Sequence, residues 1–212
     1  MSAMHLAVEA DPAPVAAAAP QFTSDWFSRH IPVWTQLLAP WMGREAHALE
    51  IGSYEGRSAI WLCEHVLTHA ASRLTCIDLF SGDGSQDYSV AEGDRLYERF
   101  ATNIARHIGK LRVWRGESGR LLRQHPVGPA YDFIYIDGSH KSWHVLEDAI
   151  LSWRLLKVGG VLLFDDYMGG ETSNHHYPHL GINCFIACHQ DALQIVHRGY
   201  QLAVRKVSDA TD

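Results

Sequence analysis

Five carboxylates are the residues of this 212-residue sequence best placed to do chemistry, because each follows a short apolar run. Glu50 ends "HALE" and Asp78 ends "RLTCID". Asp137 ends "YDFIYID", and Asp165 and Asp166 follow "GVLLF". Carboxylates bind cations, accept hydrogen bonds from hydroxyl groups and transfer protons. If the apolar runs are neighbouring parallel strands, these acids gather at one edge of a sheet, where ligands bind in such folds.

A glycine turn follows the first of these acids, in "LEIGSYEGRSA" at residues 49–59. A dinucleotide-binding turn carries three glycines and holds a pyrophosphate, whereas this turn has only Gly52 and Gly56 beside the carboxylate of Glu50. That carboxylate would repel a pyrophosphate and favours a ligand with positive charge. S-adenosylmethionine fits, with its sulfonium and ammonium groups, and Asp78 on the next strand can accept its ribose hydroxyls. The alternative is an unrelated α/β enzyme with a tight first turn.

Asp137, Asp165 and Asp166 form a cluster in the predicted site. Three neighbouring carboxylates repel one another unless they share a proton or a cation. Oxygen ligands in this number suit Mg²⁺, with water and substrate oxygens completing an octahedron. The sequence therefore predicts a magnesium site. The alternative is structural, with Asp166 capping the next turn and Asp165 binding backbone amides.

The apolar runs alternate with helical stretches, which indicates a parallel sheet covered by helices on both faces. One such stretch, "SWHVLEDAILSWRLLKVGG", carries apolar side chains at Trp143, Leu146, Ile150 and Trp153 and is expected to end at Gly159–Gly160. The last stretch, "ALQIVHRGYQLAVRK", is typical of an antiparallel hairpin about "RG". We predict a doubly wound, mostly parallel seven-stranded α/β sheet with an antiparallel C-terminal hairpin.

Four segments are expected along the chain. Residues 1–20 include the proline- and alanine-rich "DPAPVAAAAP" and are predicted to be a disordered lead-in. Residues 21–42 carry apolar side chains at helical intervals and form either a lid over the pocket or an apolar cover on the sheet. Residues 43–207 form the main α/β domain. Residues 208–212 are a disordered tail.

The composition argues against several kinds of partner. The net charge of −6 provides no general basic field, so nucleic acid is not expected as a partner. No apolar run approaches the ~20 residues that span a bilayer, and the chain begins without signal-peptide features, so no membrane partner is expected. Four scattered cysteines indicate reduced thiols in a cytoplasmic protein, and "CFIAC" is expected to lie on one buried helix face.

Five motifs follow one another in an order that resembles a known family: "LEIGSYEGRSA", "CIDLF", "GES", "FIYIDGSH" and "LLFDDY". They resemble the class I S-adenosylmethionine-dependent methyltransferases, which have a Rossmann-like fold. Within that class the closest likeness is to the branch called methyltransferase domain 24, related to macrolide-sugar and catechol O-methyltransferases. The resemblance covers roughly residues 45 to 166 and, more weakly, the C-terminal hairpin. It implies that residues 43–207 are a methyltransferase domain.

The resemblance assigns roles to particular residues. The turn that holds the methionine half of the cofactor matches Glu50, Gly52, Tyr54, Gly56 and Ser58. The ribose-binding acid matches Asp78, and the residue beside the adenine matches Ser118. The expected cofactor-binding set is completed by Ser53, Leu79 and Asp137. The Mg²⁺ ligands match Asp137, Asp165 and Asp166. For Tyr54 and Ser58 the alternative is helix capping and packing.

His140, three residues after Asp137, matches the general base of the metal-dependent relatives. A histidine titrates near neutral pH and can take a hydroxyl proton as the methyl group moves. The adjacent Lys141 is the alternative base, and an ordinary surface histidine in a loop is the structural alternative.

The reaction that these expectations describe is transfer of the sulfonium methyl group to a hydroxyl of a small molecule, namely a natural-product, sugar or phenolic acceptor. The metal would bind the hydroxyl and lower its pKa. Two alternatives stay open. One is a metal-independent N- or carboxyl-methyltransferase in which the acids are structural, and the other is a non-catalytic S-adenosylmethionine-binding protein. Exposed tryptophans in residues 21–42 would also allow a homodimer or a higher homo-oligomer.

Overall fold

The computed structural model of this chain describes residues 19–82, 89–126, 128–170 and 176–209. The predicted lead-in at residues 1–20 therefore lies outside the described residues as far as residue 18. The predicted tail at residues 208–212 lies outside them from residue 210 onward.

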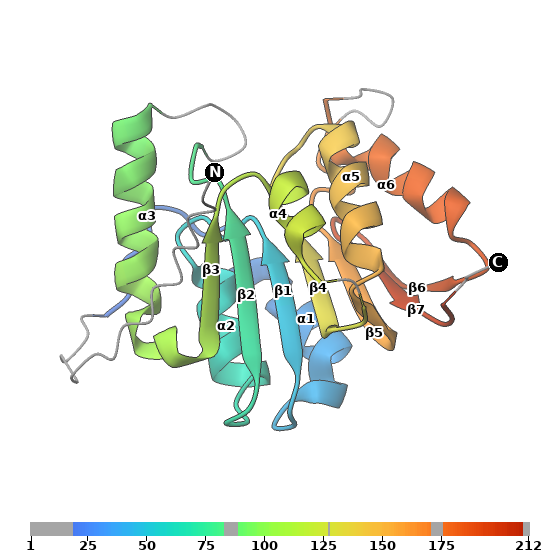
Figure 1. The fold of residues 1–212 in the computed structure, drawn as a ribbon, viewed down its shortest axis with the longest axis horizontal. Coiled ribbons are helices and arrows are strands. Elements are labelled where there is room, and N and C mark those ends of the chain that lie inside the picture. Colours follow the sequence, from blue (N-terminus) through green and yellow to red (C-terminus); the bar gives the residue numbers. More distant parts are fainter. Residues whose placement is uncertain (1–18, 83–88, 127, 171–175, 210–212) are drawn as a thin grey trace.

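A seven-stranded sheet forms the centre of the molecule, in the order β3-β2-β1-β4-β5-β7-β6 (Figure 1). The strands are β1 (His47–Ile51), β2 (Arg73–Asp78), β3 (Leu111–Arg115), β4 (Tyr131–Ile136), β5 (Leu156–Phe164), β6 (Leu193–Arg198) and β7 (Leu202–Lys206). The first five strands are parallel, whereas β7 runs antiparallel to both β5 and β6. The predicted doubly wound sheet with an antiparallel C-terminal hairpin is confirmed.

Helices cover both faces of this sheet (Figure 1). The helices on one face are α1 (Ile31–Leu38), α2 (Arg57–Trp61) with the π-helical turn that continues it (Leu62–Val66), and α3 (Val90–Ile104). Those on the other face are α4 (Ser118–Gln124), α5 (Ser142–Trp153) and α6 (Pro178–Cys188). Side chains alternate across each strand, so that Ala48 packs into the first core and its neighbour Leu49 into the second.

The N-terminal region packs on the sheet. Trp34 on α1 is fully buried, and its ring centroid lies 5.4 Å from that of Phe133 and 4.7 Å from that of Tyr135 on β4. The expectation of exposed tryptophans is therefore wrong for Trp34, which belongs to the core. Trp26, just before the 3₁₀ turn Ser28–His30, is 51% exposed.

Hydrogen bonds tie the segment before Trp26 to the glycine turn. The backbone N–H of Thr23 and its hydroxyl donate to the two carboxylate oxygens of Glu55, each at 2.7 Å. Glu55 is 2% exposed and also accepts from Arg99 at 2.6 Å. Because Glu55 follows Tyr54 directly, these bonds fix the start of the described chain beside the predicted cofactor turn.

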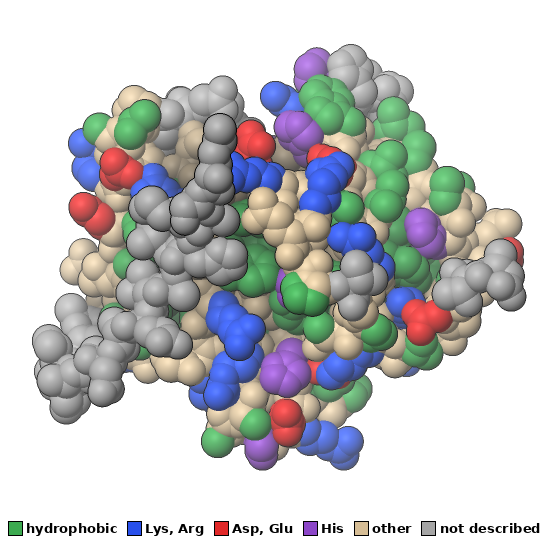
Figure 2. All heavy atoms as spheres, in the orientation of Figure 1, with side chains coloured by type: hydrophobic (Ala, Val, Ile, Leu, Met, Phe, Trp, Pro, Cys, Tyr) green, Lys and Arg blue, Asp and Glu red, His purple; other side chains and the backbone are tan. Residues whose placement is uncertain are grey.

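Helix α5 is shorter than predicted, and only part of its predicted apolar stripe packs on the core. It ends at Trp153, and the two glycines expected to end it lie inside β5, because Leu156 already pairs with Tyr131 of β4. Of the four apolar positions, Trp153 is buried and Leu146 is partly buried against the core, whereas Trp143 and Ile150 are exposed. Figure 2 shows the resulting hydrophobic side chains on the outer surface of α5 and α6.

The predicted buried face of "CFIAC" is also wrong. Cys184 and Cys188 are exposed on α6, whereas Cys63 and Cys76 are buried, and all four are free thiols. Phe185 takes the core-facing position instead, since a larger apolar side chain gains more from burial than a thiol does. Among the helices of the described residues, none has the length and hydropathy that crossing a bilayer requires.

Candidate active site

A cleft with a volume of about 280 Å³ opens where β1, β2, β4 and β5 end. The residues that line it are Trp26, Arg29, Gly52, Tyr54, Asp78, Gly82, Asp137, Gly138, His140, Asp165, Asp166 and Tyr200. A smaller pocket shares part of this lining and reaches Ser53 and Ser58. Both lie where the strand order reverses between β1 and β4, the usual ligand site of such sheets. The structure thus brings four of the five predicted acids into one cleft.

The glycines of the first turn are required by the packing of the chain itself. Gly52 has a φ of +89°, and a Cβ atom there would lie 2.1 Å from the backbone oxygen of Asp137. Gly56 has a φ of +84°, and its Cβ would lie 2.9 Å from Cγ2 of Ile104. The ends of β1 and β4 therefore approach each other closely only because residue 52 has no side chain.

Glu50, the predicted carboxylate of this turn, is fully buried and lines neither pocket. One of its oxygens accepts from the hydroxyl of Ser58 at 2.5 Å and the other from that of Ser53 at 2.6 Å. Burial raises the pKa of Glu50 to about 7, against the opposing effect of the two serines. In the structure Glu50 stabilises the turn through its hydrogen bonds with Ser53 and Ser58. Its contact with the cofactor stays a prediction.

Asp78 also holds the turn, but it faces the cleft. Its Oδ2 accepts from the backbone N–H groups of Ser53 and Tyr54 at 2.7 and 2.8 Å, and its Oδ1 from that of Phe80 at 2.6 Å. Burial raises the pKa of Asp78 in spite of these three donors. Because a carboxylate offers about four acceptor positions, Asp78 retains capacity for one more donor, such as a ribose hydroxyl.

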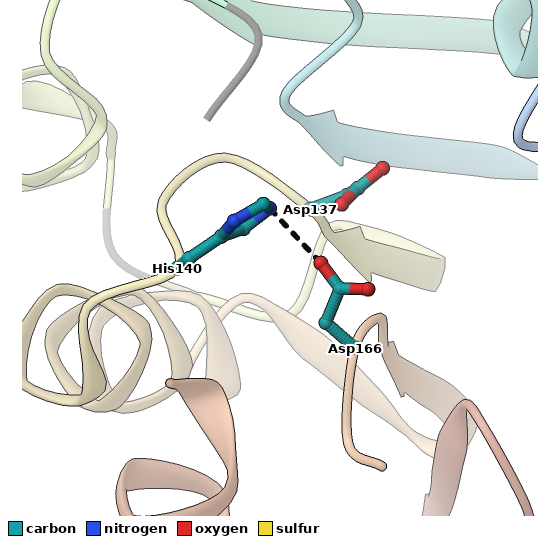
Figure 3. A group of neighbouring side chains, drawn as sticks. All are labelled: Asp137, His140 and Asp166. Carbon is teal, nitrogen blue, oxygen red and sulfur yellow. Dashed lines mark ion pairs between the residues drawn. The ribbon is translucent and has the colours of Figure 1, made fainter. Parts of the chain in front are cut away.

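His140 and two of the acids form the compact group of the site. The imidazole of His140 points to Asp166, with Nε2 2.9 Å from Oδ2, and Asp137 lies beside them at the end of β4 (Figure 3). One ligand atom from each of the three residues lies within 4.8 Å of the other two. Burial, Asp165 and Asp166 together raise the pKa of Asp137 well above its ordinary value. Burial also acts to raise the pKa of Asp166, but hydrogen bonds from His140 and Tyr200, together with the charges of His140 and Arg29, outweigh it and lower that pKa.

Asp165 lies outside this group of three, and its predicted role as a Mg²⁺ ligand stays a prediction. It lines the cleft, but its Oδ1 accepts from the backbone N–H of Asp166 at 2.7 Å, and its Oδ2 accepts from Gln201 at 2.9 Å and from the hydroxyl of Tyr135. The same hydroxyl lies 2.9 Å from Asp137 Oδ2. Because one hydroxyl carries one hydrogen, it cannot donate to both carboxylates. A shared proton or a cation would therefore relieve the repulsion between Asp137 and Asp165.

Leu79 and Ser118 do not line either pocket of the described chain. Leu79 is 48% exposed. The side chain of Ser118 is hydrogen-bonded to Asp148 of α5, whose pKa is raised by burial to about 7 despite that bond. The predicted contacts of Leu79 and Ser118 with the cofactor stay predictions.

Apart from two glycines, three cleft residues had no assigned role in the sequence-based prediction. Trp26 lies with its ring centroid 5.2 Å from that of Tyr54, in the region expected to be a lid or a cover. Arg29 places its guanidinium carbon 4.5 Å from the ring centroid of Tyr200. Tyr200 lies in the turn between β6 and β7 and donates its hydroxyl to Asp166. No sequence motif marks Tyr200, because only the return of β7 beside β5 brings it to the cleft.

These side chains fit both groups that the sequence predicts. The open acceptor capacity of Asp78 suits a ribose hydroxyl, and the rings of Trp26 and Tyr54 offer the aromatic faces that attract a cation such as a sulfonium. Asp137 and Asp166 supply the hard oxygen ligands that Mg²⁺ prefers. An imidazole is a weaker ligand for Mg²⁺, so His140 suits a proton-carrying role beside the ion.

The profile of a family described as a methyltransferase domain matches residues 49–167, more than half of the chain. The chain belongs to this family and is a class I S-adenosylmethionine-dependent methyltransferase, which replaces the non-catalytic alternative. Among curated proteins, none matches the sequence.

Solved structures share the fold at low sequence identity. A proposed O-methyltransferase from Klebsiella pneumoniae has a TM-score of 0.64 and 16% identity, over 88% of this chain and 83% of that one. MycE of the mycinamycin biosynthetic pathway, solved with Mg and S-adenosylhomocysteine, has a TM-score of 0.59 and 14% identity, over 89% of this chain and 52% of its own. A proposed rRNA methylase from Clostridium thermocellum has a TM-score of 0.64 and 10% identity, over 85% and 97% of the two chains. Such likeness establishes the fold and leaves the acceptor open.

Proposed function

We propose that this protein is a metal-dependent O-methyltransferase that methylates a hydroxyl of a small molecule, of natural-product, sugar or phenolic type. The group of Asp137, His140 and Asp166, with ligand atoms within 4.8 Å of one another in the cleft, carries the proposal. It combines oxygen ligands for a divalent cation with a base for the hydroxyl proton. MycE, solved with Mg, S-adenosylhomocysteine and mycinamycin VI, supports this choice by its fold.

The cofactor half of the cleft would hold S-adenosylmethionine through the glycine turn. The cofactor, when bound, supplies the sulfonium methyl group. Asp78 would accept a ribose hydroxyl while it keeps Ser53 and Tyr54 in place through their backbone N–H groups. Trp26 and Tyr54 would cover the sulfonium with aromatic surface and exclude water from it.

The acceptor half would hold the cation and the nucleophile. Mg²⁺, when bound, supplies a Lewis acid that makes a hydroxyl easier to deprotonate. Asp137 and Asp166 would bind it, and Asp165, fixed by Gln201 and Tyr135, would add negative charge nearby. His140 would take the hydroxyl proton, because the carboxylate of Asp166 at 2.9 Å stabilises the imidazolium that forms.

A thermal melt with S-adenosylhomocysteine, with Mg²⁺ or with EDTA, tests the proposal. A ligand at ~100 times its Kd adds roughly 2.7 kcal/mol, which for a chain of this size is a rise in Tm on the order of 5–10 °C. We expect that rise and a further Mg²⁺-dependent rise, and we expect Asp166→Asn to lose only the second. Asp165→Asn is the matched variant. It should lose the Mg²⁺-dependent rise if Asp165 is a ligand, and keep it if the site is the group of Asp137, His140 and Asp166. A rise that ignores Mg²⁺ and EDTA, with turnover that survives EDTA, would contradict metal dependence.

A second candidate is a metal-independent methyltransferase acting on nitrogen or a carboxyl group of a small molecule. The observation in its favour is that Asp166 already accepts from His140 and Tyr200, and Asp165 from Gln201 and Tyr135. In that case the acids position His140 and the turn before β7. Wild-type turnover in EDTA, together with full turnover by Asp137→Asn, is the result that would favour it.

A further inference from the structure

Four residues of the cleft form a continuous chain of side-chain contacts apart from the glycine turn. Arg29 lies over Tyr200, Tyr200 donates to Asp166, and Asp166 pairs with His140. If the proposed function holds, on which this inference rests, the glycine turn and Asp78 serve the cofactor. Arg29, His140, Asp166 and Tyr200 are then left to meet the acceptor.

Arg29 stands out by its charge. It is the single lysine or arginine among the described residues that line this cleft, against four carboxylates. Its Nε donates to Nε2 of His30 at 3.0 Å, and it forms no ion pair with a described carboxylate. The guanidinium therefore enters the cleft with its charge unmatched at contact distance.

Its orientation is fixed from two sides. The guanidinium lies on the ring of Tyr200, at 4.5 Å from the centroid, and the ring of His30 stacks on the same tyrosine at 5.5 Å. The ring of His30 is buried and accepts the hydrogen bond from Arg29. An arginine held in this way loses little side-chain entropy when it binds a planar anion through two N–H groups.

We propose that Arg29 binds a carboxylate of the methyl acceptor, so that the substrates are hydroxylated organic acids. The carboxylate meets Arg29 at one end of the acceptor, and the hydroxyl to be methylated lies at the other end, beside His140. Arg29 also offsets the repulsion that the four acids of the cleft exert on an anionic substrate. A neutral acceptor leaves this guanidinium unused.

The test uses pairs of acceptors that differ only in charge: 3,4-dihydroxybenzoate with its amide, and glucuronate with its amide. Each is assayed with the full chain, S-adenosylmethionine and Mg²⁺, for wild type, Arg29→Gln and Arg29→Lys. Arg120→Gln, an exposed change on α4 outside both pockets, is the matched control for lost charge. We expect wild type to prefer the acids, and Arg29→Gln to lose about 10- to 100-fold in kcat/KM on the acids alone, mainly through KM. Arg29→Lys should lie between the two, and Arg120→Gln should match wild type.

Three results would overturn the proposal: no turnover of any acid, equal turnover of acids and amides by wild type, or equal loss on both in Arg29→Gln. A further arm measures the Kd of S-adenosylhomocysteine and of 5′-methylthioadenosine, which lacks the amino-acid carboxylate. If Arg29→Gln weakens only the former, Arg29 binds the carboxylate of the cofactor and the proposal is wrong. If wild type binds neither nucleoside, the proposed function itself has failed, which separates the two failures.

Discussion

The two halves of the cleft use carboxylates in opposite ways. On the cofactor side, Asp78 in the cleft and the buried Glu50 of the glycine turn are surrounded by donors, and hydroxyl or backbone N–H groups reach every one of their oxygens. In the acceptor half, Asp137, Asp165 and Asp166 lie beside one another, and the pKa of Asp137 is raised by burial and by its two neighbours. The first pair shapes the backbone of the site. The second group concentrates negative charge that a ligand has to neutralise.

This difference shows that the position of an acid at a strand end does not decide its role. All five acids lie at or just after the ends of strands of one sheet, yet the donors around each one determine whether its charge is already matched. Changes in the acceptor half should therefore affect the reaction, whereas changes in the cofactor half should affect folding first.

The largest effect is expected for His140→Ala, which should lower kcat by about 10²- to 10⁴-fold with a modest change in KM, because the proton of the acceptor loses its base. The measurement is steady-state kinetics on any acceptor that wild type methylates. His144→Ala is the matched control, since His144 lies one turn away and bonds to Ser139. A kcat near that of wild type would remove His140 as the base and direct attention to Lys141.

Gly52→Ala should give the next largest effect, on stability. Its Cβ would lie 2.1 Å from the backbone oxygen of Asp137, at a φ of +89°. Overpacking and a left-handed backbone together cost about 2–5 kcal/mol in the free energy of unfolding. Urea unfolding measures this cost. Gly43→Ala is the control, because its φ of +75° brings the same backbone strain while nothing lies within 4 Å; equal losses in both variants would show that the close approach of β1 and β4 is not the cause.

The alternation of strands and helices and the antiparallel hairpin could be predicted from the sequence, as could the ends of β1, β2, β4 and β5, because each of these four is a short apolar run with an acid at or just after its end. What could not be predicted is where a helix gives way to a strand. "LLKVGG" continues the helical pattern of α5, but pairing of Leu156 with Tyr131 makes it part of β5. Which side chains of α5 pack on the core could not be predicted either, since Trp143 is apolar and yet exposed.

The site shows the same limit. Spacing placed Asp78, Asp137, Asp165 and Asp166 at one edge of the sheet, and all four line the cleft. The donors that distinguish them are distant in sequence: Gln201 bonds to Asp165 across 36 positions and Tyr200 to Asp166 across 34. A role that depends on such partners follows only from the packed structure.

The pH dependence of stability should test the buried acid of the cofactor half. Glu50 has a pKa of about 7 in the folded chain against 4.5 for an ordinary glutamate, so the folded state holds its proton more tightly than the unfolded state does. The stability that this proton provides is present below pH 4.5 and is lost as the pH rises to 7, by up to about 3 kcal/mol. Glu50→Gln should flatten the decrease in unfolding free energy between pH 5 and pH 7.

Asp148 has the same sign of shift, also to about 7, and lies away from the glycine turn. Asp148→Asn should therefore flatten the same pH range by a comparable amount without affecting the turn. If Glu50→Gln leaves the slope of wild type unchanged, Glu50 is ionised throughout this range and its two serines compensate fully for burial.

The smallest effect separates folding from cofactor binding within the glycine turn itself. Ser58 lines the smaller pocket, but its hydroxyl donates to Glu50 at 2.5 Å. Ser58→Ala should cost about 1 kcal/mol of stability, the ordinary value of one hydrogen bond, and should change the Kd of S-adenosylhomocysteine by less than about twofold. Ser53→Ala is the matched variant, because the hydroxyl of Ser53 donates to the other oxygen of Glu50. A loss of affinity of about tenfold in Ser58→Ala with unchanged stability would mean that this hydroxyl turns from Glu50 to the cofactor on binding, and the contrast between the two halves of the cleft would then hold only before the cofactor is bound.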